Sequence, residues 1–266
     1  MQKGLIEHFE TMSDPRVDRT KRYPLIEIIF LIISGTVSGC DGWKSLKDFG
    51  EAKLDWLRKF LPYKEGIPAD DTLARVMRRI ETKEFQACFM KWVQSVSEVT
   101  SGDVVAIDGK TLRQSHNHRD GLAAIHMVSA WSSQNGLVLG QEKTAIKSNE
   151  ITAIPQLLDV LELKGCIVTI DAMGCQTAIA EKIIQKKADY MLALKGNQGK
   201  LHAEVTDFFK IALAENFKHI NNDYYEEHDV GHGRIEYRQC WSIKPSTLNF
   251  PPFKNWPNLK SLIMIK

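Results

Sequence analysis

The sequence predicts an α/β protein in which a small all-α domain precedes a mixed β-sheet flanked by helices. Three observations support this fold class. The first hundred residues carry apolar side chains at helical spacing and lack long alternating runs. After residue 100, short β-type runs such as 104–107 and 167–170 alternate with helical patterns. A chain of 266 residues is also long enough to bury the core that such a fold needs.

Composition excludes several classes of protein. With 43% apolar and 26% charged residues, the chain is neither collagen-like, disordered nor a small disulfide-stapled domain. The formal net charge of +2 does not by itself demand a polyanionic partner. Five scattered cysteines without a C-x-x-C pair favour a reduced cytoplasmic chain.

No membrane contact is expected. The one strongly apolar run, 25–37, contains Glu27 and is too short for a spanning helix, which needs roughly 20 residues. The N-terminal residues lack the basic region, apolar region and cleavage site of a secretory signal. We therefore expect a cytoplasmic protein.

We assign residues 1–100 to the helical domain. Helices are predicted over 25–37, after Pro24, and over 43–61, up to Pro62. A further helical series runs from about residue 72 to 96, with Asp71 or Thr72 as its N-cap. Its basic face has two interpretations, phosphate contact or a solvated helix surface; the residues are Arg75, Arg78 and Arg79.

Residues 101–266 are predicted to form the α/β core. Strands are expected over 104–107, 125–131, 137–141, 166–170 and 190–194, and helices over 151–161, 177–187 and 200–215. The turn 134–136 (QNG) joins two of these strands into a hairpin. This order indicates a mixed sheet covered on both faces. Later strands at 235–243 and 259–265 indicate the start of a β-rich insertion, and a chain ending inside a strand pattern suggests missing C-terminal sequence.

Two aspartates are the strongest candidates for chemistry. Asp108 and Asp171 each follow a buried β-type run directly, where α/β proteins place their sites. Two neighbouring carboxylates repel unless a cation lies between them, and oxygen ligands without His or Cys favour Mg²⁺ or Mn²⁺. The alternative is that both aspartates simply end strands at turns. The strand order is similar to that of the RNase H-like fold, in which such acids bind two metal ions for phosphodiester chemistry.

Polar residues near the same predicted crevice are candidates for contact with a nucleic-acid backbone. They are Lys110, Arg113, Lys195, Asn197 and Gln198. Ordinary loop polarity is the competing interpretation. His116 and His118 form an H-x-H in a basic loop, but we find no further ligands for a zinc site.

Several strings, in order along the chain, closely resemble the H-repeat-associated proteins linked to Rhs elements, which are insertion-sequence transposases of the DDE class. In the core they are 107–113 (IDGKTLR), 147–155 (KSNEITAIP), 171–176 (DAMGCQ), 194–199 (LKGNQG) and 231–236 (GHGRIE). In the first hundred residues they are 38–43 (SGCDGW) and 66–76 (GIPADDTLARV). The second group resembles the helical domain that accompanies this catalytic core, for which DNA contact is expected.

The resemblance implies that Asp108 and Asp171 are the first two acids of the DDE set. They would hold two Mg²⁺ ions, with Mn²⁺ as a substitute, for attack on a phosphodiester. The implied partner is double-stranded DNA, both element ends and target, bound by a homo-oligomer. The third acid is open: Glu236 lies in a matching string, Glu204 follows the 190–194 strand, and the family's own glutamate segment has no counterpart here.

Three functional hypotheses follow. The first is a DNA transposase whose activity is impaired by C-terminal truncation. The second is a catalytically inactive DNA-binding remnant that recognises element ends. The third is an RNase H-like nuclease that acts without transposition.

Overall fold

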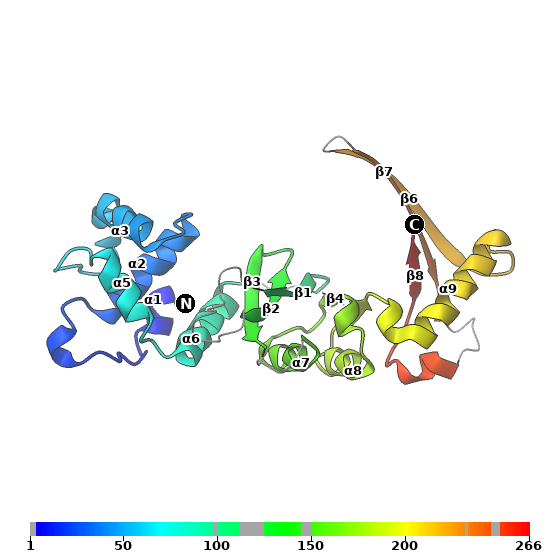
Figure 1. Ribbon diagram of the computed structural model, residues 1–266, viewed down its shortest axis with the longest axis horizontal. Helices are drawn as coiled ribbons and strands as arrows, with labels where there is room; N and C mark the ends of the chain where they lie inside the picture. Colours follow the sequence, from blue (N-terminus) through cyan, green and yellow to red (C-terminus); the bar gives the residue numbers. More distant parts are fainter. Residues whose placement is uncertain (1–3, 98–100, 112–124, 145–149, 232–233, 246–250) are drawn as a thin grey trace, which may run out of the picture. The chain divides into compact units, whose positions relative to one another are not determined.

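The computed structural model describes residues 4–97, 101–111, 125–144, 150–231, 234–245 and 251–266 (Figure 1). The chain divides into two compact units, Met1–Glu98 and Val99–Lys266. In the described residues, no helix combines the length and apolarity that crossing a membrane requires.

The first unit is helical. Its elements are α1 (Leu5–Phe9), η1 (Asp18–Thr20), α2 (Leu25–Val37), α3 (Trp43–Ala52), α4 (Leu54–Leu57), α5 (Asp70–Met77) and α6 (Thr82–Val96). Helix α2 runs through the core, and nine of its residues are buried, because its sequence is apolar around almost the whole helix.

Two expectations for this unit were wrong. The predicted single helix 43–61 is broken at Lys53, which caps both α3 and α4 with a non-helical backbone. The predicted N-cap is also displaced, because α5 already begins at Asp70 and its N-cap, Ala69, has no side-chain hydrogen bond. Both aspartates of its first turn instead lie where the helix dipole favours negative charge.

The second unit contains the mixed five-stranded sheet that the sequence predicts. Its strands are β1 (Val104–Thr111), β2 (His126–Ser132), β3 (Leu137–Lys143), β4 (Ile167–Ile170) and β5 (Asp189–Leu192). Their order is β3-β2-β1-β4-β5, with β1, β4 and β5 parallel and the β1–β2 and β2–β3 pairs antiparallel.

Helices cover one face of this sheet. Helix α7 (Glu150–Val160) contacts β2 and β3, helix α8 (Thr177–Gln185) contacts β5, and the two helices contact each other (Figure 1). On the opposite face Asp108 and Met191 are exposed. The expectation of a sheet covered on both faces is therefore wrong for the described residues, because the helix after β5 packs elsewhere.

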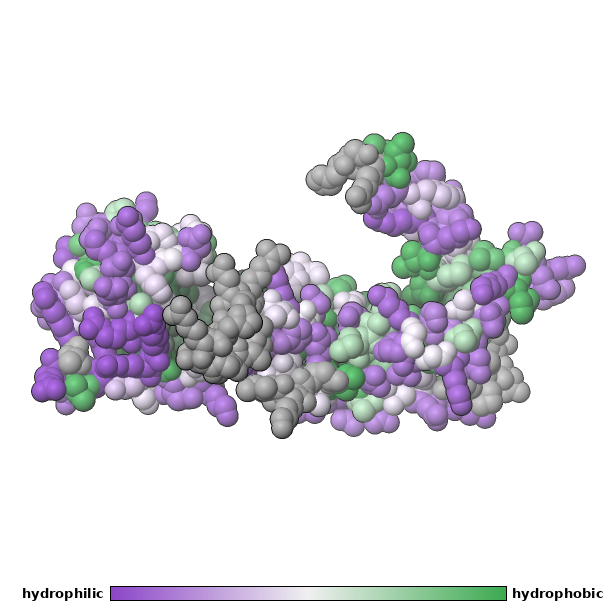
Figure 2. Space-filling model, in the orientation of Figure 1, coloured by the Kyte–Doolittle hydropathy of each residue, from purple (hydrophilic) through white to green (hydrophobic). Residues whose placement is uncertain are grey.

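That helix, α9 (Gly199–Ala214), packs on a second sheet. The sheet has the order β6-β7-β8, with β6 (Asn222–Gly231), β7 (Arg234–Ile243) and β8 (Leu262–Ile265). A 3₁₀ turn, η5 (Pro251–Asn255), precedes β8. The shared core contains Phe209, Phe217 and Trp241. At the far end of the β6–β7 hairpin, Val230 and Ile235 are 78% and 80% exposed and form an apolar surface (Figure 2).

Candidate active site

The two predicted aspartates lie at the same level on neighbouring strands. In the parallel β1–β4 pair, Ile107 is opposite Ile170, so Asp108 and Asp171 are the next residues on each strand. One detail of the prediction was wrong: β1 does not end before Asp108 but continues to Thr111, because antiparallel pairing with β2 holds it there. Asp108 thus has the rigid backbone of a strand, whereas Asp171 begins a loop.

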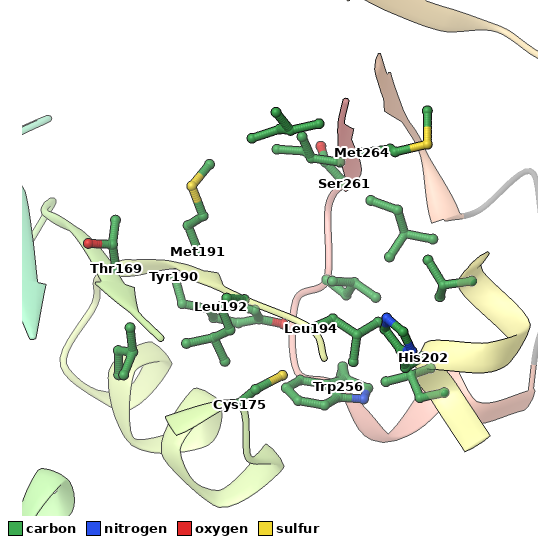
Figure 3. Close-up of a pocket in the computed structure, with 18 of the residues that line it drawn as sticks. Thr169, Cys175, Tyr190, Met191, Leu192, Leu194, His202, Trp256, Ser261 and Met264 are labelled. Atoms are coloured by element: carbon green, nitrogen blue, oxygen red, sulfur yellow. The ribbon is translucent and has the colours of Figure 1, made fainter. Parts of the chain in front are cut away.

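Both aspartates line one groove with a volume of about 1030 Å³. Its lining comes from β4 and β5 on one side and from α9 and the β8 segment on the other (Figure 3). Most of that lining is apolar and includes Leu192, Leu201, Phe209, Trp256 and Ile263. The groove therefore combines two carboxylates with a wide apolar wall.

Two polar side chains of this wall are partly or fully buried. The Tyr190 hydroxyl donates a 2.8 Å hydrogen bond to the Pro257 carbonyl, which links β5 to the segment before β8. Burial raises the pKa of Tyr190 to about 12, so it remains a donor at neutral pH. Burial also raises the pKa of the Cys175 thiol to about 11, so this groove residue stays protonated and is a poor metal ligand.

The Asp171 carboxylate is oriented by its own loop. Its Oδ1 accepts a 3.0 Å hydrogen bond from the Met173 N–H, which caps the 3₁₀ turn η2 (Ala172–Gly174). Asn197 donates to the Ala172 carbonyl, and Gln198 donates a 2.8 Å hydrogen bond to the Cys175 carbonyl. Both amides therefore brace the loop that begins at Asp171.

The area around Asp108 includes a set of residues that the sequence analysis missed. Glu150, the first described residue of α7, lies against Gly109, and its Oε1 is 2.7 Å from His126 Nε2. The other ring nitrogen of His126, Nδ1, is 2.9 Å from the Thr111 hydroxyl. The only sequence signal for Glu150 was its place in the string 147–155. Its contact with Gly109 joins segments distant in the sequence, so local residue patterns do not predict it.

The predicted basic residues are only partly described. Lys110 is exposed on β1, two residues beyond Asp108, and Lys195 is exposed directly before the turn η3 (Gly196–Gln198). Arg113, His116 and His118 lie outside the described residues. Neither lysine forms an ion pair with another residue in the described part of the chain.

A family described as "Transposase DDE domain" matches residues 100–248, more than half of the chain. A family described as "DDE_Tnp_1-associated" matches residues 6–93. The chain belongs to the DDE transposase family.

Several relatives of this DDE transposase chain are named as putative transposases. "Putative transposase YncI" of Escherichia coli O157:H7 is 44% identical over 98% of this chain and 66% of its own length. "H repeat-associated putative transposase YhhI" of Escherichia coli (strain K12) is 43% identical over 89% of this chain and 62% of its own length. The chain thus spans about two thirds of these relatives, whereas it covers 94% of "Putative transposase YncI" of strain K12, at 46% identity.

A solved piggyBac transposase synaptic complex with hairpin DNA also aligns with the chain. The TM-score is 0.40 at 10% identity, over 97% of this chain and 55% of that protein. A likeness at this level supports no conclusion about this chain.

The candidates for a third acid lie apart from the aspartate pair. Glu236 is on β7, opposite Asp229, where it pairs with Arg238. Glu204 is exposed on α9 and lines a smaller polar pocket with Asn197 and Gln198. Among the described residues, no group of three or more His, Cys, Asp or Glu side chains is placed to hold a metal ion.

The donor set around the aspartate pair nevertheless suits one kind of cation. Within the described residues, Asp108 has no hydrogen bond or ion pair, and Asp171 uses one of its two oxygens. Mg²⁺ is commonly bound through one or two carboxylates, with waters and substrate phosphates completing its shell. The two carboxylates therefore fit Mg²⁺ or Mn²⁺ and do not fit a closed metal cage made of protein ligands alone.

Proposed function

We propose that this chain carries the DNA cleavage and strand-transfer site of an insertion-sequence transposase, with an RNase H-like core. The observation that carries this proposal is the register of β1 and β4, which sets Asp108 and Asp171 side by side at the edge of one groove. Transposase chemistry needs two such carboxylates on a rigid support. The membership of the chain in the DDE transposase family supports the same assignment.

In this proposal Asp108 and Asp171 hold Mg²⁺, or Mn²⁺ in its place. The bound ion supplies charge stabilisation for in-line displacement at a phosphodiester. Asp108 contributes a carboxylate on a strand, and Asp171 contributes one that the Met173 N–H orients.

DNA contact is the second part of the proposal. Lys110 and Lys195 are exposed near the two strand ends and would contact phosphates of double-stranded DNA, together with Arg113. Asn197 and Gln198 would hydrogen-bond to the same DNA backbone through side-chain atoms that are not bonded to the loop beginning at Asp171. We propose Glu236 as the third acid. It would have to move to Asp108 and Asp171 when DNA binds. Joining two element ends would require a homo-oligomer.

The test is cleavage and joining of DNA that carries element ends, in the presence of Mg²⁺. We expect Asp108→Asn and Asp171→Asn each to lower the rate at least about 100-fold, since each removes a ligand charge. Asp223→Asn, on exposed β6, is the matched control and should retain activity. Cleavage that survives both site substitutions would refute the assignment of these residues.

The second candidate is a catalytically inactive DNA-binding protein. The observation that favours it is the lack of a third acid beside Asp108 and Asp171 in the described residues. In that case end-bearing DNA would bind in a salt-dependent manner, with no cleavage and with no effect of Asp108→Asn. Nicking without joining would instead favour a nuclease.

A further inference from the structure

We infer that Glu150 is a positioning residue for Asp108. It holds the carboxyl end of β1 from the helix-covered face of the sheet, so that the Asp108 carboxylate is presented to the groove on the other face. This inference rests on the proposed role of Asp108 as a metal ligand. It gives a function to Glu150, a described residue of the string 147–155.

The contact between Glu150 and β1 is so close that a side chain at position 109 would displace the Glu150 carboxylate. A Cβ added to Gly109 would lie 2.0 Å from Glu150 Oε1 and 2.3 Å from its Cδ. Gly109 does not have a positive φ, so its backbone is open to any L-residue. The close fit at Gly109 therefore comes from the Glu150 side chain and not from the conformation of the strand.

Glu150 is itself fixed in this position. Its carboxylate can only accept, so His126 Nε2 donates the 2.7 Å hydrogen bond, and Nδ1 faces the Thr111 hydroxyl at 2.9 Å. Thr111 and His126 are also opposite each other in the β1–β2 pair. These contacts connect the end of β1, the start of β2 and the start of α7. The Glu150 side chain at their centre is only 14% exposed.

The geometry of a strand transmits this restraint to Asp108. Successive side chains of a strand point to opposite faces, so Gly109 faces Glu150 and Asp108 faces the groove. β4 pairs with β1 only up to Ile107, so beyond that residue the parallel neighbour no longer holds the strand. Glu150 contacts Gly109, the residue that follows Asp108 on this part of the strand.

The first experiment is a double-mutant cycle in the full chain. Gly109→Ala, Glu150→Ala and the double variant are compared by hydrogen exchange in a peptide covering 104–111, with a β4 peptide as reference. We expect Gly109→Ala to accelerate exchange strongly in the wild-type background and to add nothing when Glu150 is already alanine. Equal effects in both backgrounds would overturn the inferred contact.

The second experiment measures Mn²⁺ affinity of the same variants. We expect Glu150→Ala to weaken Mn²⁺ binding at least about ten-fold, as substitutions of residues that orient a metal ligand typically do. Glu150→Gln should recover most of the affinity, because its amide oxygen still accepts from His126. The matched control is Glu162→Ala, an exposed glutamate just beyond α7, which should bind as the wild type does.

The outcomes separate this inference from the proposed function. If exchange changes but Glu150→Ala binds Mn²⁺ as the wild type does, Glu150 stabilises the strand without positioning Asp108, and the inference is wrong. If the wild type binds no Mn²⁺, the proposed metal site fails, and the exchange cycle alone decides whether Glu150 holds the end of β1. Additive effects in that cycle would then refute the inference as well.

Discussion

At the scale of single residues, burial and hydrogen bonding give three acidic side chains different roles. Asp108 is exposed and has no partner among the described residues, so both of its oxygens are open to a cation. Asp103 is buried and receives hydrogen bonds from Ser132 and from the Gln134 N–H. Glu27 is buried as well, but its Oε2 has no partner in the described structure. Residue type alone distinguishes none of these cases.

We predict that Glu27 makes the stability of the first unit depend on pH. Burial raises the pKa of Glu27, while the Tyr63 N–H and Lys64 partly oppose the shift. Because the folded-state pKa of Glu27 lies above the ordinary value of 4.5, the folded state favours the protonated carboxyl. This contribution to the free energy of unfolding is complete below pH 4.5 and is lost as the pH rises through the folded-state pKa.

Urea unfolding at several pH values between 4 and 8 measures this effect, with hydrogen exchange in α2 as the readout. Glu27→Gln should remove the fall in stability with rising pH, because the amide does not ionise. Glu10→Gln, on an exposed residue, is the control. The same pH dependence in the wild type and Glu27→Gln would contradict the prediction.

At the scale of elements, the sequence predicted those whose patterns are local. Helix α2 has the predicted bounds because Pro24 precedes a continuous apolar run, and the β2–β3 hairpin forms around its Asn-Gly turn. Strand β6 was missed: its sequence is acidic and tyrosine-rich, and pairing with β7 is what makes it a strand. In the site, the two aspartates were found because apolar strands precede them, whereas Glu150 depends on a contact between distant segments.

Asp103 links the start of β1 to the β2–β3 turn, and we predict that Asp103→Ala destabilises the second unit by about 3 kcal/mol. Its Oδ2 accepts from the Ser132 hydroxyl at 2.6 Å, and its Oδ1 accepts from the Gln134 N–H at 3.1 Å. Removing the carboxylate leaves the fully buried Ser132 hydroxyl without this acceptor. Urea denaturation measures the loss, and Ser133→Ala, exposed in the same turn, is the control. A loss no larger than that of the control would refute this role.

At the scale of the second unit, the groove depends on how two sheets are joined. The Tyr190–Pro257 hydrogen bond and the Lys260–Asp189 ion pair, at 2.7 Å, connect β5 to the segment that leads into β8. Such long-range contacts follow from tertiary packing, so sequence patterns predicted the strands but not the groove between them.

The most direct test of the account is a titration of the full chain with Mn²⁺, followed by electron paramagnetic resonance. The central claim is that Asp108 and Asp171 together form one cation-binding site. It predicts that Asp108→Asn and Asp171→Asn each weaken Mn²⁺ binding at least about ten-fold, and that the double variant loses little more, because either change already disrupts the shared site. Mn²⁺ binding that is unchanged by Asp108→Asn would contradict it.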